Sequence, residues 1–401
     1  MKGFFSADII FMNGSKAQIQ PSPVLCKKDR VLVMEKLKIG FIGCGGIAMD
    51  KHLPGMASQA DRIDMYYFCD ILPERAEEAR TKYGCEGAKI CTDYREMLAD
   101  PDVYAVHVLT PNVKHCEISC AAMEAGKHVI CEKPMAATYA DALKMYATHR
   151  RTGKLLTIGY QYRHMDGNKA MKEYVDTGAL GEIYYAEATA FRRRGIPTWG
   201  VFTNKAEQGG GPLIDMATHA LDLTLWMMDN YEVESVTGQT FAKIGPVATP
   251  DEMGNDFGPW DPAKYELEDA AFGFVRMKNG ALINVRCSWA LNLIPREGMV
   301  RLCGTKGGLD AAGFGEVTAN HVIANRCVDS KIATRSPFPR KGGTIDRNPM
   351  VSPQDAEAKI WVDALLGLGD LFVTPEQALT VTKILDAIYE SARTGKTIYF
   401  D

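Results

Sequence analysis

The chain has 401 residues, of which 46% are hydrophobic and 24% are charged, and its formal net charge is −4. This composition is typical of a globular protein of two or three domains, and the small net charge gives no general attraction to nucleic acid or to anionic lipid. No uninterrupted apolar run is long enough to span a bilayer. The 11 cysteines include no CxxC pair, which predicts buried free thiols in a cytoplasmic protein and no metal site.

The first 33 residues differ in character from those that follow. Their short apolar run is interrupted by Asp8, which makes a poor signal peptide. Met34 begins a segment that is typical of the start of a domain. We therefore expect residues 1–33 to be a dispensable extension, residues 34–159 to form a first domain, and residues 160–401 to form a second.

A glycine-rich loop opens the first domain. The β-rich run Lys38–Ile42 is followed by Gly43-Cys-Gly45-Gly-Ile-Ala48 and then by a helical stretch. This is the G-x-G-x-x-G/A pattern in its proper context. Gly43 would allow the tight turn, Gly45 would let the backbone approach a pyrophosphate, and Ala48 is small enough for packing of the helix on the strand. The loop predicts a dinucleotide site.

An acidic residue closes the next expected strand. Asp70 follows the run Met65–Cys69 and lies 22 residues after Ala48, where a carboxylate can accept hydrogen bonds from an adenosine ribose. A 2′-phosphate would be repelled by this charge, so the sequence favours NAD over NADP. The alternative is a turn aspartate that precedes a helix started by Pro73.

Strands alternate with helices through the rest of this domain, which predicts a doubly wound parallel sheet. The expected strand at His128–Cys131 is followed by Glu132-Lys133-Pro134. Ligands of such sheets bind at the carboxyl ends of strands, so Lys133 is expected in the cofactor crevice. Pro134 could hold a cis peptide bond that aims Lys133. A surface lysine is the alternative.

A second glycine-rich turn precedes a helical stretch at Gly209–Met228. Pro212 suits a first helical turn, and Asp215 and His219 are four residues apart, so both project from one face of a helix. A carboxylate beside an imidazole can serve as a general base with an orienting or substrate-binding partner. The alternative is an aspartate favoured by the helix dipole together with an ordinary interior histidine.

Five segments together carry a resemblance: GCGGIA, Asp70, TPNVKH, AGKHVICEKP and GGGPLIDMATHALD. From about Met34 to the C-terminus the chain resembles the Gfo/Idh/MocA family of NAD(P)-dependent oxidoreductases. The resemblance implies an α/β fold, with a Rossmann doubly wound parallel sheet and a second α+β domain that holds a large, mostly antiparallel open sheet. The β-rich runs at 233–243, 270–277, 281–289 and 299–304 favour that sheet. The resemblance also implies a homo-oligomer.

The same resemblance implies the site residues. It makes Lys133, Asp215 and His219 catalytic. The residues expected to bind the cofactor are Gly43, Gly45, Gly46, Ile47, Asp70, Thr110, Pro111, Asn112, His115, Glu132 and Lys133. The residues expected to bind substrate are Tyr160, Arg163, His164, Trp199, Asp215 and His219. For Tyr160 and Arg163, structural packing is an equal alternative.

We expect an NAD-dependent dehydrogenase that oxidises a secondary hydroxyl of a pyranose sugar or glycoside, at C3 by resemblance. His219 would take the hydroxyl proton, Lys133 would stabilise the alkoxide, and Asp215 would hold a substrate hydroxyl or orient the base. The arginines at 192–194 could bind a carboxylate, so acidic sugars are also candidate substrates. An inositol dehydrogenase, a redox-assisted NAD-dependent glycosidase or lyase, and a non-catalytic NAD or sugar sensor are the alternatives. The acid–base groups argue against the sensor.

Overall fold

The structure, a computed structural model, describes residues 35–248, 261–294, 298–311, 322–328, 331–335, 340–341, 344–345 and 351–400. The expected extension at 1–33 lies outside these residues. From Lys36 onward the chain forms one unit that contains two large sheets. The first sheet ends at Ile158 and the second begins at Ile183, and the boundary at 159/160 stays a prediction.

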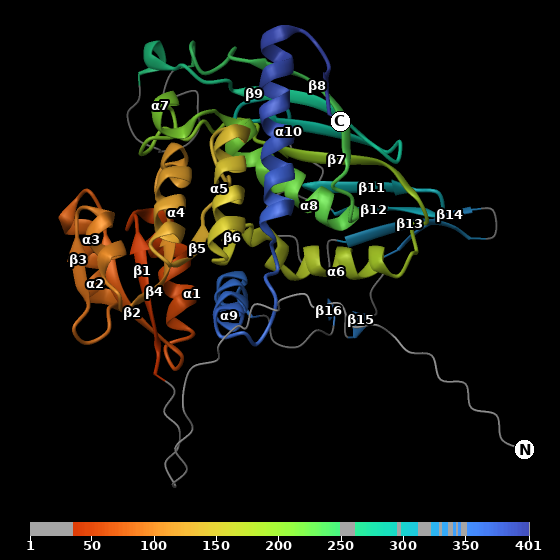
Figure 1. The fold of residues 1–401 in the computed structure, drawn as a ribbon. Coiled ribbons are helices and arrows are strands. Elements are labelled where there is room, and N and C mark those ends of the chain that lie inside the picture. The colour runs from red at the N-terminus through yellow and green to blue at the C-terminus, as the bar shows by residue number, and fades with distance from the viewer. Residues whose placement is uncertain are drawn as a thin grey trace, which may run out of the picture. The chain divides into compact units, whose positions relative to one another are not determined.

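The first sheet is six-stranded and parallel, with the order β3-β2-β1-β4-β5-β6 (Figure 1). Its strands are β1 (Leu37–Ile42), β2 (Ile63–Cys69), β3 (Lys89–Cys91), β4 (Val103–Val108), β5 (His128–Cys131) and β6 (Leu156–Ile158). The strand order reverses between β1 and β4, and ligands of open α/β sheets bind at such a switch point. The predicted Rossmann arrangement is confirmed.

Helices connect and cover these strands. They are η1 (Ala48–His52), α1 (Leu53–Ala57), α2 (Pro73–Tyr83), α3 (Tyr94–Ala99), η2 (Asn112–Lys114), α4 (His115–Glu124) and α5 (Tyr139–Thr152). α2 begins at Pro73 as the sequence predicts, since proline is well suited to a first helical turn. α5 begins after Thr138, whose hydroxyl accepts a hydrogen bond from the Asp141 backbone N–H. Local start signals thus fixed both helices.

The second sheet has nine strands in the order β14-β13-β12-β11-β7-β10-β9-β8-β17. They are β7 (Ile183–Phe191), β8 (Val233–Phe241), β9 (Ala270–Met277), β10 (Leu282–Ser288), β11 (Val300–Gly304), β12 (Gly307–Ala311), β13 (Val322–Val328), β14 (Lys331–Arg335) and β17 (Ile398–Tyr399). All neighbouring pairs are antiparallel except β7 and β10, which are parallel. β15 (Arg340–Lys341) and β16 (Thr344–Ile345) form a separate pair. The large, mostly antiparallel sheet is confirmed.

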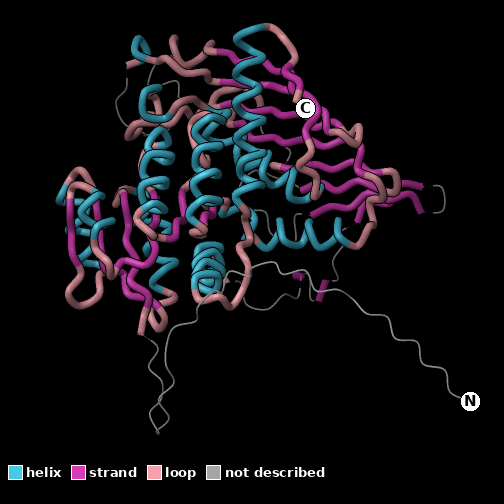
Figure 2. Tube along the Cα trace, in the orientation of Figure 1, coloured by secondary structure: helices cyan, strands magenta, loops and turns pink. Residues whose placement is uncertain are grey.

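The helices of this second part are η3 (Gln161–His164), α6 (Asp166–Asp176), α7 (Lys205–Gln208), η4 (Leu213–Ala217), α8 (Thr218–Met228), η6 (Pro262–Lys264), α9 (Pro353–Leu365) and α10 (Pro375–Thr394). α8 packs on β7 and α10 packs on β8, and Figure 2 shows the long helix α10 beside the strands of the larger sheet. No helix in the described part of the chain combines the length and the apolar character needed to cross a bilayer.

The chain returns to the first sheet near its end. Trp361 and Val362 of α9 belong to the same buried cluster as Ile39 and Phe41 of β1. The other face of the first sheet shares a larger core with the second sheet. Residues 353–365 therefore complete the core of the Rossmann part, which a continuous division at residue 160 does not anticipate.

Candidate active site

The glycine loop after β1 has the shape of a dinucleotide cradle. Gly43 has a φ of +94°, and a Cβ there would lie 2.6 Å from the carbonyl oxygen of Leu109, so this position requires glycine. A Cβ at Gly45 or Gly46 would meet no heavy atom closer than 4.0 Å and 3.8 Å, respectively. Ile47 is 39% exposed. The loop therefore leaves open space beside its backbone at the start of η1, which fits a pyrophosphate group.

Asp70 anchors this loop. Its Oδ2 accepts a hydrogen bond from the Cys44 backbone N–H at 2.8 Å, and its Oδ1 accepts one from the Leu72 N–H at 3.0 Å. An ionised carboxylate has about four lone-pair sites, so it can hold the turn and still accept hydrogen bonds from a ribose. The geometry is compatible with both interpretations of this residue.

The loop after β4 is tied to the rest of the site by two side chains. Asn112 Nδ2 donates to the Gln208 carbonyl at 3.0 Å. His115 Nδ1 lies 2.8 Å from the Pro134 carbonyl, and its Nε2 lies 3.0 Å from the Thr110 carbonyl. His115 is completely buried, and burial lowers its pKa. It therefore holds two loops together, and its predicted role in binding the cofactor stays a prediction. Contacts of Thr110, Pro111 and Asn112 stay predictions.

Glu132 is buried in a network of hydrogen bonds. Its Oε1 accepts hydrogen bonds from Lys51 Nζ at 2.6 Å and from His52 Nε2 at 2.9 Å, and its Oε2 accepts one from the Lys133 backbone N–H at 3.0 Å. Lys51 also pairs with Glu357 of α9 at 3.0 Å. Burial opposes the charge of Glu132, but Lys51 and His52 hold its pKa well below the usual range. The carboxylate is buried and used in this network, and its predicted cofactor contact stays a prediction.

Two of the predicted catalytic residues meet directly. The Lys133–Pro134 peptide is cis. Lys133 Nζ donates to the Asp215 backbone carbonyl at 3.0 Å and to Asp215 Oδ1 at 3.1 Å. Asp215 lies in η4, a wide π-helical turn that leads into α8. The carboxyl end of β5 and the start of this helix, 82 residues apart in the chain, thus form one site.

Trp289, directly after β10, completes the surroundings of Asp215. Its Nε1 donates to Asp215 Oδ2 at 3.0 Å. Burial raises the pKa of Asp215, but the Lys133 ammonium and the Trp289 N–H outweigh it, so the pKa lies below its usual value. Asp215 is therefore ionised at neutral pH. Sequence reasoning missed Trp289, because no spacing links it to residues 74 positions earlier.

His219 lies in the first turn of α8, and its ring meets the ring of Tyr162 edge to face, with centroids 4.6 Å apart. Nδ1 of His219 is buried and has no partner among the described residues. Burial, reinforced by the charge of Lys133, holds the pKa of His219 well below its usual value. The imidazole is therefore neutral and can accept a proton. No hydrogen bond joins it to Asp215 within the described part of the chain; Asp215 orients Lys133 instead.

The helical segment that carries Asp215 and His219 is held at its start by Glu268. Its Oε1 accepts hydrogen bonds from the backbone N–H groups of Gly211 at 2.8 Å and Leu213 at 3.3 Å, and from the Tyr389 hydroxyl at 2.7 Å. A Cβ on Gly211 would overlap the carbonyl oxygen of Glu268. The glycine turn before η4 therefore allows a close approach to β9. Glu268 was not among the predicted residues.

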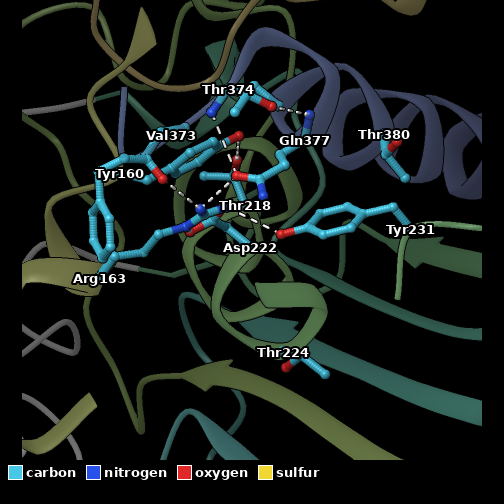
Figure 3. A network of polar contacts seen from close by, with 12 residues as sticks. Tyr160, Arg163, Thr218, Asp222, Thr224, Tyr231, Val373, Thr374, Gln377 and Thr380 are labelled. Atoms are coloured by element: carbon cyan, nitrogen blue, oxygen red, sulfur yellow. Dashed lines mark hydrogen bonds and ion pairs between the residues drawn. The ribbon is translucent and has the colours of Figure 1, made fainter. Parts of the chain in front are cut away.

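Arg163 and Tyr160 serve the core. The Arg163 guanidinium pairs with both oxygens of Asp222, at 2.9 Å and 2.6 Å, and donates to Gln377 Oε1 at 2.7 Å (Figure 3). The Tyr160 hydroxyl lies 3.2 Å from Thr218 Oγ1. Both side chains are 0% exposed. These contacts favour the packing alternative, because a buried guanidinium requires partners such as these, and the contact of both residues with substrate stays a prediction.

His164 and Trp199 differ in their surroundings. His164 is buried against Phe372, and burial lowers its pKa to about 4. It faces the core, and its contact with substrate stays a prediction. Trp199 is 42% exposed and packs on Phe202, with ring centroids 5.4 Å apart. Its contact with substrate stays a prediction. No group of three or more potential metal ligands occurs among the residues described.

Comparison with known proteins places the chain among oxidoreductases. Residues 37–160 match the model of an oxidoreductase family with an NAD-binding Rossmann fold, and residues 168–310 match the GFO/IDH/MocA C-terminal domain. The D-glucoside 3-dehydrogenase of Escherichia coli K12 is 34% identical over 365 residues, which cover 90% of this chain and 97% of that protein. The inositol 2-dehydrogenase of Salmonella typhimurium is 30% identical over 194 residues, or 48% of this chain and 55% of that protein.

A solved structure of levoglucosan dehydrogenase in complex with NADH and L-sorbose superposes with a TM-score of 0.74. The two chains are 23% identical, and the match covers 91% of this chain and 99% of the other. At that identity the superposition supports the fold alone, including both sheets.

Proposed function

The chain belongs to the Gfo/Idh/MocA family of oxidoreductases, and from this premise we propose that it oxidises the C3 hydroxyl of a glucoside with NAD as the acceptor. The observation that carries the proposal is the Lys133–Asp215 contact, with the neutral imidazole of His219 on the same helix. The similarity to D-glucoside 3-dehydrogenase along nearly its whole length supports the choice of substrate.

The side chains divide the chemistry between them. Bound NAD would supply the hydride acceptor. His219 takes the hydroxyl proton, because its depressed pKa keeps it unprotonated at neutral pH. Nδ1 is buried, so this role falls to Nε2. Lys133 stabilises the negative charge that develops on the substrate oxygen, and Asp215 holds the Lys133 ammonium in place. In the reverse direction His219 returns the proton.

We propose NAD rather than NADP as the cofactor. The cradle beside Gly45 and Gly46 fits either dinucleotide, so selectivity falls to Asp70 at the carboxyl end of β2. Its carboxylate can accept hydrogen bonds from the two hydroxyls of an adenosine ribose and would repel a 2′-phosphate.

The substrate proposal is tested by measuring NADH formation with a panel of methyl glucosides, levoglucosan, inositols and acyclic hydroxy acids, followed by product analysis. We expect glucosides to give the highest kcat/KM and a 3-keto product. Activity confined to hydroxy acids would overturn the proposal. Activity on inositols alone would favour an inositol dehydrogenase, the second candidate, which the similarity to inositol 2-dehydrogenase supports.

The same assay separates the remaining alternatives. Release of the aglycone with no net NADH would indicate a redox-assisted glycosidase or lyase. Binding without any turnover would indicate a sensor, although a sensor does not need the paired Lys133 and Asp215. By resemblance to the family we also propose a cytoplasmic homo-oligomer, and native mass spectrometry of the purified protein tests the oligomer.

A further inference from the structure

The carboxylate of Asp215 is gripped from two sides of the molecule. Oδ1 receives Lys133 Nζ from the loop after β5, and Oδ2 receives the indole N–H of Trp289 from the end of β10. Trp289 is 0% exposed. A carboxylate with one donor on each oxygen cannot rotate about its χ2 torsion without breaking a hydrogen bond. The plane of the group is thereby fixed.

Trp289 is itself held firmly. Its backbone N–H donates to the Asp269 carbonyl at 3.0 Å, and the Ser288 hydroxyl donates to the same oxygen at 2.7 Å. Asp269 Oδ2 in turn accepts three backbone N–H groups from residues 243–245, at 2.5 to 2.8 Å. The indole therefore projects from a pinned corner of the larger sheet toward the catalytic helix.

We propose that Trp289 is a positioning residue of the reaction. It fixes Asp215 so that Oδ1 faces Lys133, and Asp215 in turn aims the Lys133 ammonium at the substrate oxygen. Among the described residues the Trp289 indole donates to Asp215 and to no atom of Lys133, so in this proposal it acts through Asp215. This inference rests on the proposed function for its kinetic consequence, but the geometry around Asp215 does not depend on the substrate.

Loss of the indole N–H has two expected consequences. Oδ2 would be left without its hydrogen-bond donor, which is costly for a carboxylate that is only 16% exposed. The carboxylate could then turn away from Lys133, and a displaced catalytic group can lose up to about 100-fold in rate. The ionised form would also lose a stabilising hydrogen bond, so the pKa of Asp215 would rise. The acid limb of the kcat profile would therefore move to higher pH.

The chain offers a matched control. Trp361 in α9 is also buried, at 2% exposure, but its Nε1 has no partner among the described residues. Trp289→Phe and Trp361→Phe each remove one buried indole N–H, and only the first removes a hydrogen bond to Asp215. We expect W289F to lower kcat about tenfold to 100-fold, with unchanged affinity for NAD. W361F should stay within about twofold of the wild type.

Three readouts separate positioning from packing. The acid limb of the W289F profile should shift upward, whereas loss of packing alone would lower Tm and leave the limb in place. In an Asp215→Asn background, W289F should cause little further loss of kcat, because residues that act through one another are not additive. Trp289→His, which keeps a ring N–H, should recover part of the activity and is the second variant should W289F fold poorly.

Wild-type kinetics in W289F, an unmoved acid limb, or full additivity with D215N would overturn the proposal. Its test does not require the right substrate. If the wild type oxidises no glucoside, the proposed function fails, and the pKa of Asp215 is measured instead by NMR of ¹³C-labelled aspartate, assigned with D215N. A higher pKa in W289F than in the wild type and W361F supports the positioning role, and an equal pKa contradicts it.

Discussion

Two buried glutamates hold the two halves of the candidate active site, and they do so by different means. Glu132 accepts a hydrogen bond from the backbone N–H of Lys133. It also accepts hydrogen bonds from the side chains of Lys51 and His52. Glu268 supports the start of the helix that carries Asp215 and His219, and its partners are backbone N–H groups and the hydroxyl of Tyr389.

The difference shows in their electrostatics. Burial disfavours the charge of both carboxylates. At Glu132 the ionic partners overcome this and the pKa falls well below the usual range, whereas at Glu268 the neutral donors do not and the pKa is raised. The Lys133 half of the site therefore depends on a compensated set of charges, and the helix half depends on neutral hydrogen bonds. Each half can be broken separately.

The largest expected effect comes from removing the catalytic group of each half. Lys133→Ala and His219→Ala should each lower kcat by about 10²–10⁴-fold, the usual loss for acid–base groups, while NAD binding persists. The double variant should lose much less than the product of the two, because groups that act as a unit are not additive. Steady-state kinetics with NAD titrations measure this. Near-normal turnover in H219A would remove His219 from the base role.

Next in size is the loss of Glu132. Glu132→Ala leaves Lys51 buried with only Glu357 as a charged partner, and breaking a buried ion pair typically costs about 3–5 kcal/mol. Urea unfolding should show a loss of this order. Glu132→Gln, which keeps the volume and one acceptor, is the control and should lose less. Equal stability of E132A and the wild type would mean that this network does not stabilise the Lys133 half.

The matching change in the helix half should cost less. Glu268→Ala leaves two backbone N–H groups and the Tyr389 hydroxyl without their acceptor, and unsatisfied neutral groups cost about 1–3 kcal/mol. The free energy of unfolding should therefore fall less in E268A than in E132A. The reverse order would contradict the electrostatic comparison of the two halves.

A selectivity change of about tenfold, or about 1.4 kcal/mol, is expected at Asp70. Asp70→Ala removes the charge that would repel a 2′-phosphate, so the ratio of kcat/KM for NAD to that for NADP should fall. Asp70→Asn removes the charge but keeps an acceptor for the Cys44 and Leu72 N–H groups. Comparing it with Asp70→Ala separates the effect of the charge from the effect of the lost hydrogen bonds in the loop. If wild-type turnover with NADP equals that with NAD, Asp70 does not select the cofactor.

The smallest effect is a pH signature of opposite sign in the two halves. The folded-state pKa of Glu132 is depressed, so its contribution to stability is present above the unfolded value of about 4.3 and is lost as pH falls toward the folded value. The folded-state pKa of Glu268 is raised, so the folded state takes up its proton first and gains relative stability as pH falls through that value toward the unfolded one.

Unfolding free energies of the wild type, E132Q and E268Q between about pH 7 and the unfolded glutamate pKa of about 4.3, and just below it, measure this signature. As pH falls toward that value, the free energy of unfolding of the wild type should rise relative to that of E268Q. Below that value it should fall relative to that of E132Q. Parallel curves for the two variants would show that the two carboxylates titrate alike.

Much of the fold could be predicted from the sequence, because the turns and helix starts that define it depend on local residues. The loop from Gly43 to Ala48 and the helix start at Pro73 each depend on neighbouring residues. The three-residue strand β3 was missed, since Lys89–Cys91 is too short to show a period. The placement of α9 on the first sheet was missed because it depends on tertiary packing.

The sequence predicted the centre of the candidate site but not the hydrogen-bond partners of the residues around it. Lys133 and Asp215 do meet. Polar residues near strand ends were predicted to contact ligands. The Arg163 side chain, however, is buried in a pair with Asp222, a partner 59 positions away. Trp289 and Glu268 were missed for the same reason, since their hydrogen-bond partners also come from distant parts of the chain. A single sequence gives residue types at strand ends but not the partners that decide their roles.

The central claim is that a hydride leaves C3 of a glucoside while Lys133 and His219 manage the hydroxyl proton and the charge on oxygen. Methyl glucoside deuterated only at C3, incubated with NAD and the wild-type enzyme, tests it most directly by mass spectrometry of the reduced cofactor. The account predicts one deuterium in each reduced nicotinamide and a ketone at C3 of the sugar. Reduced cofactor that carries no deuterium would contradict it.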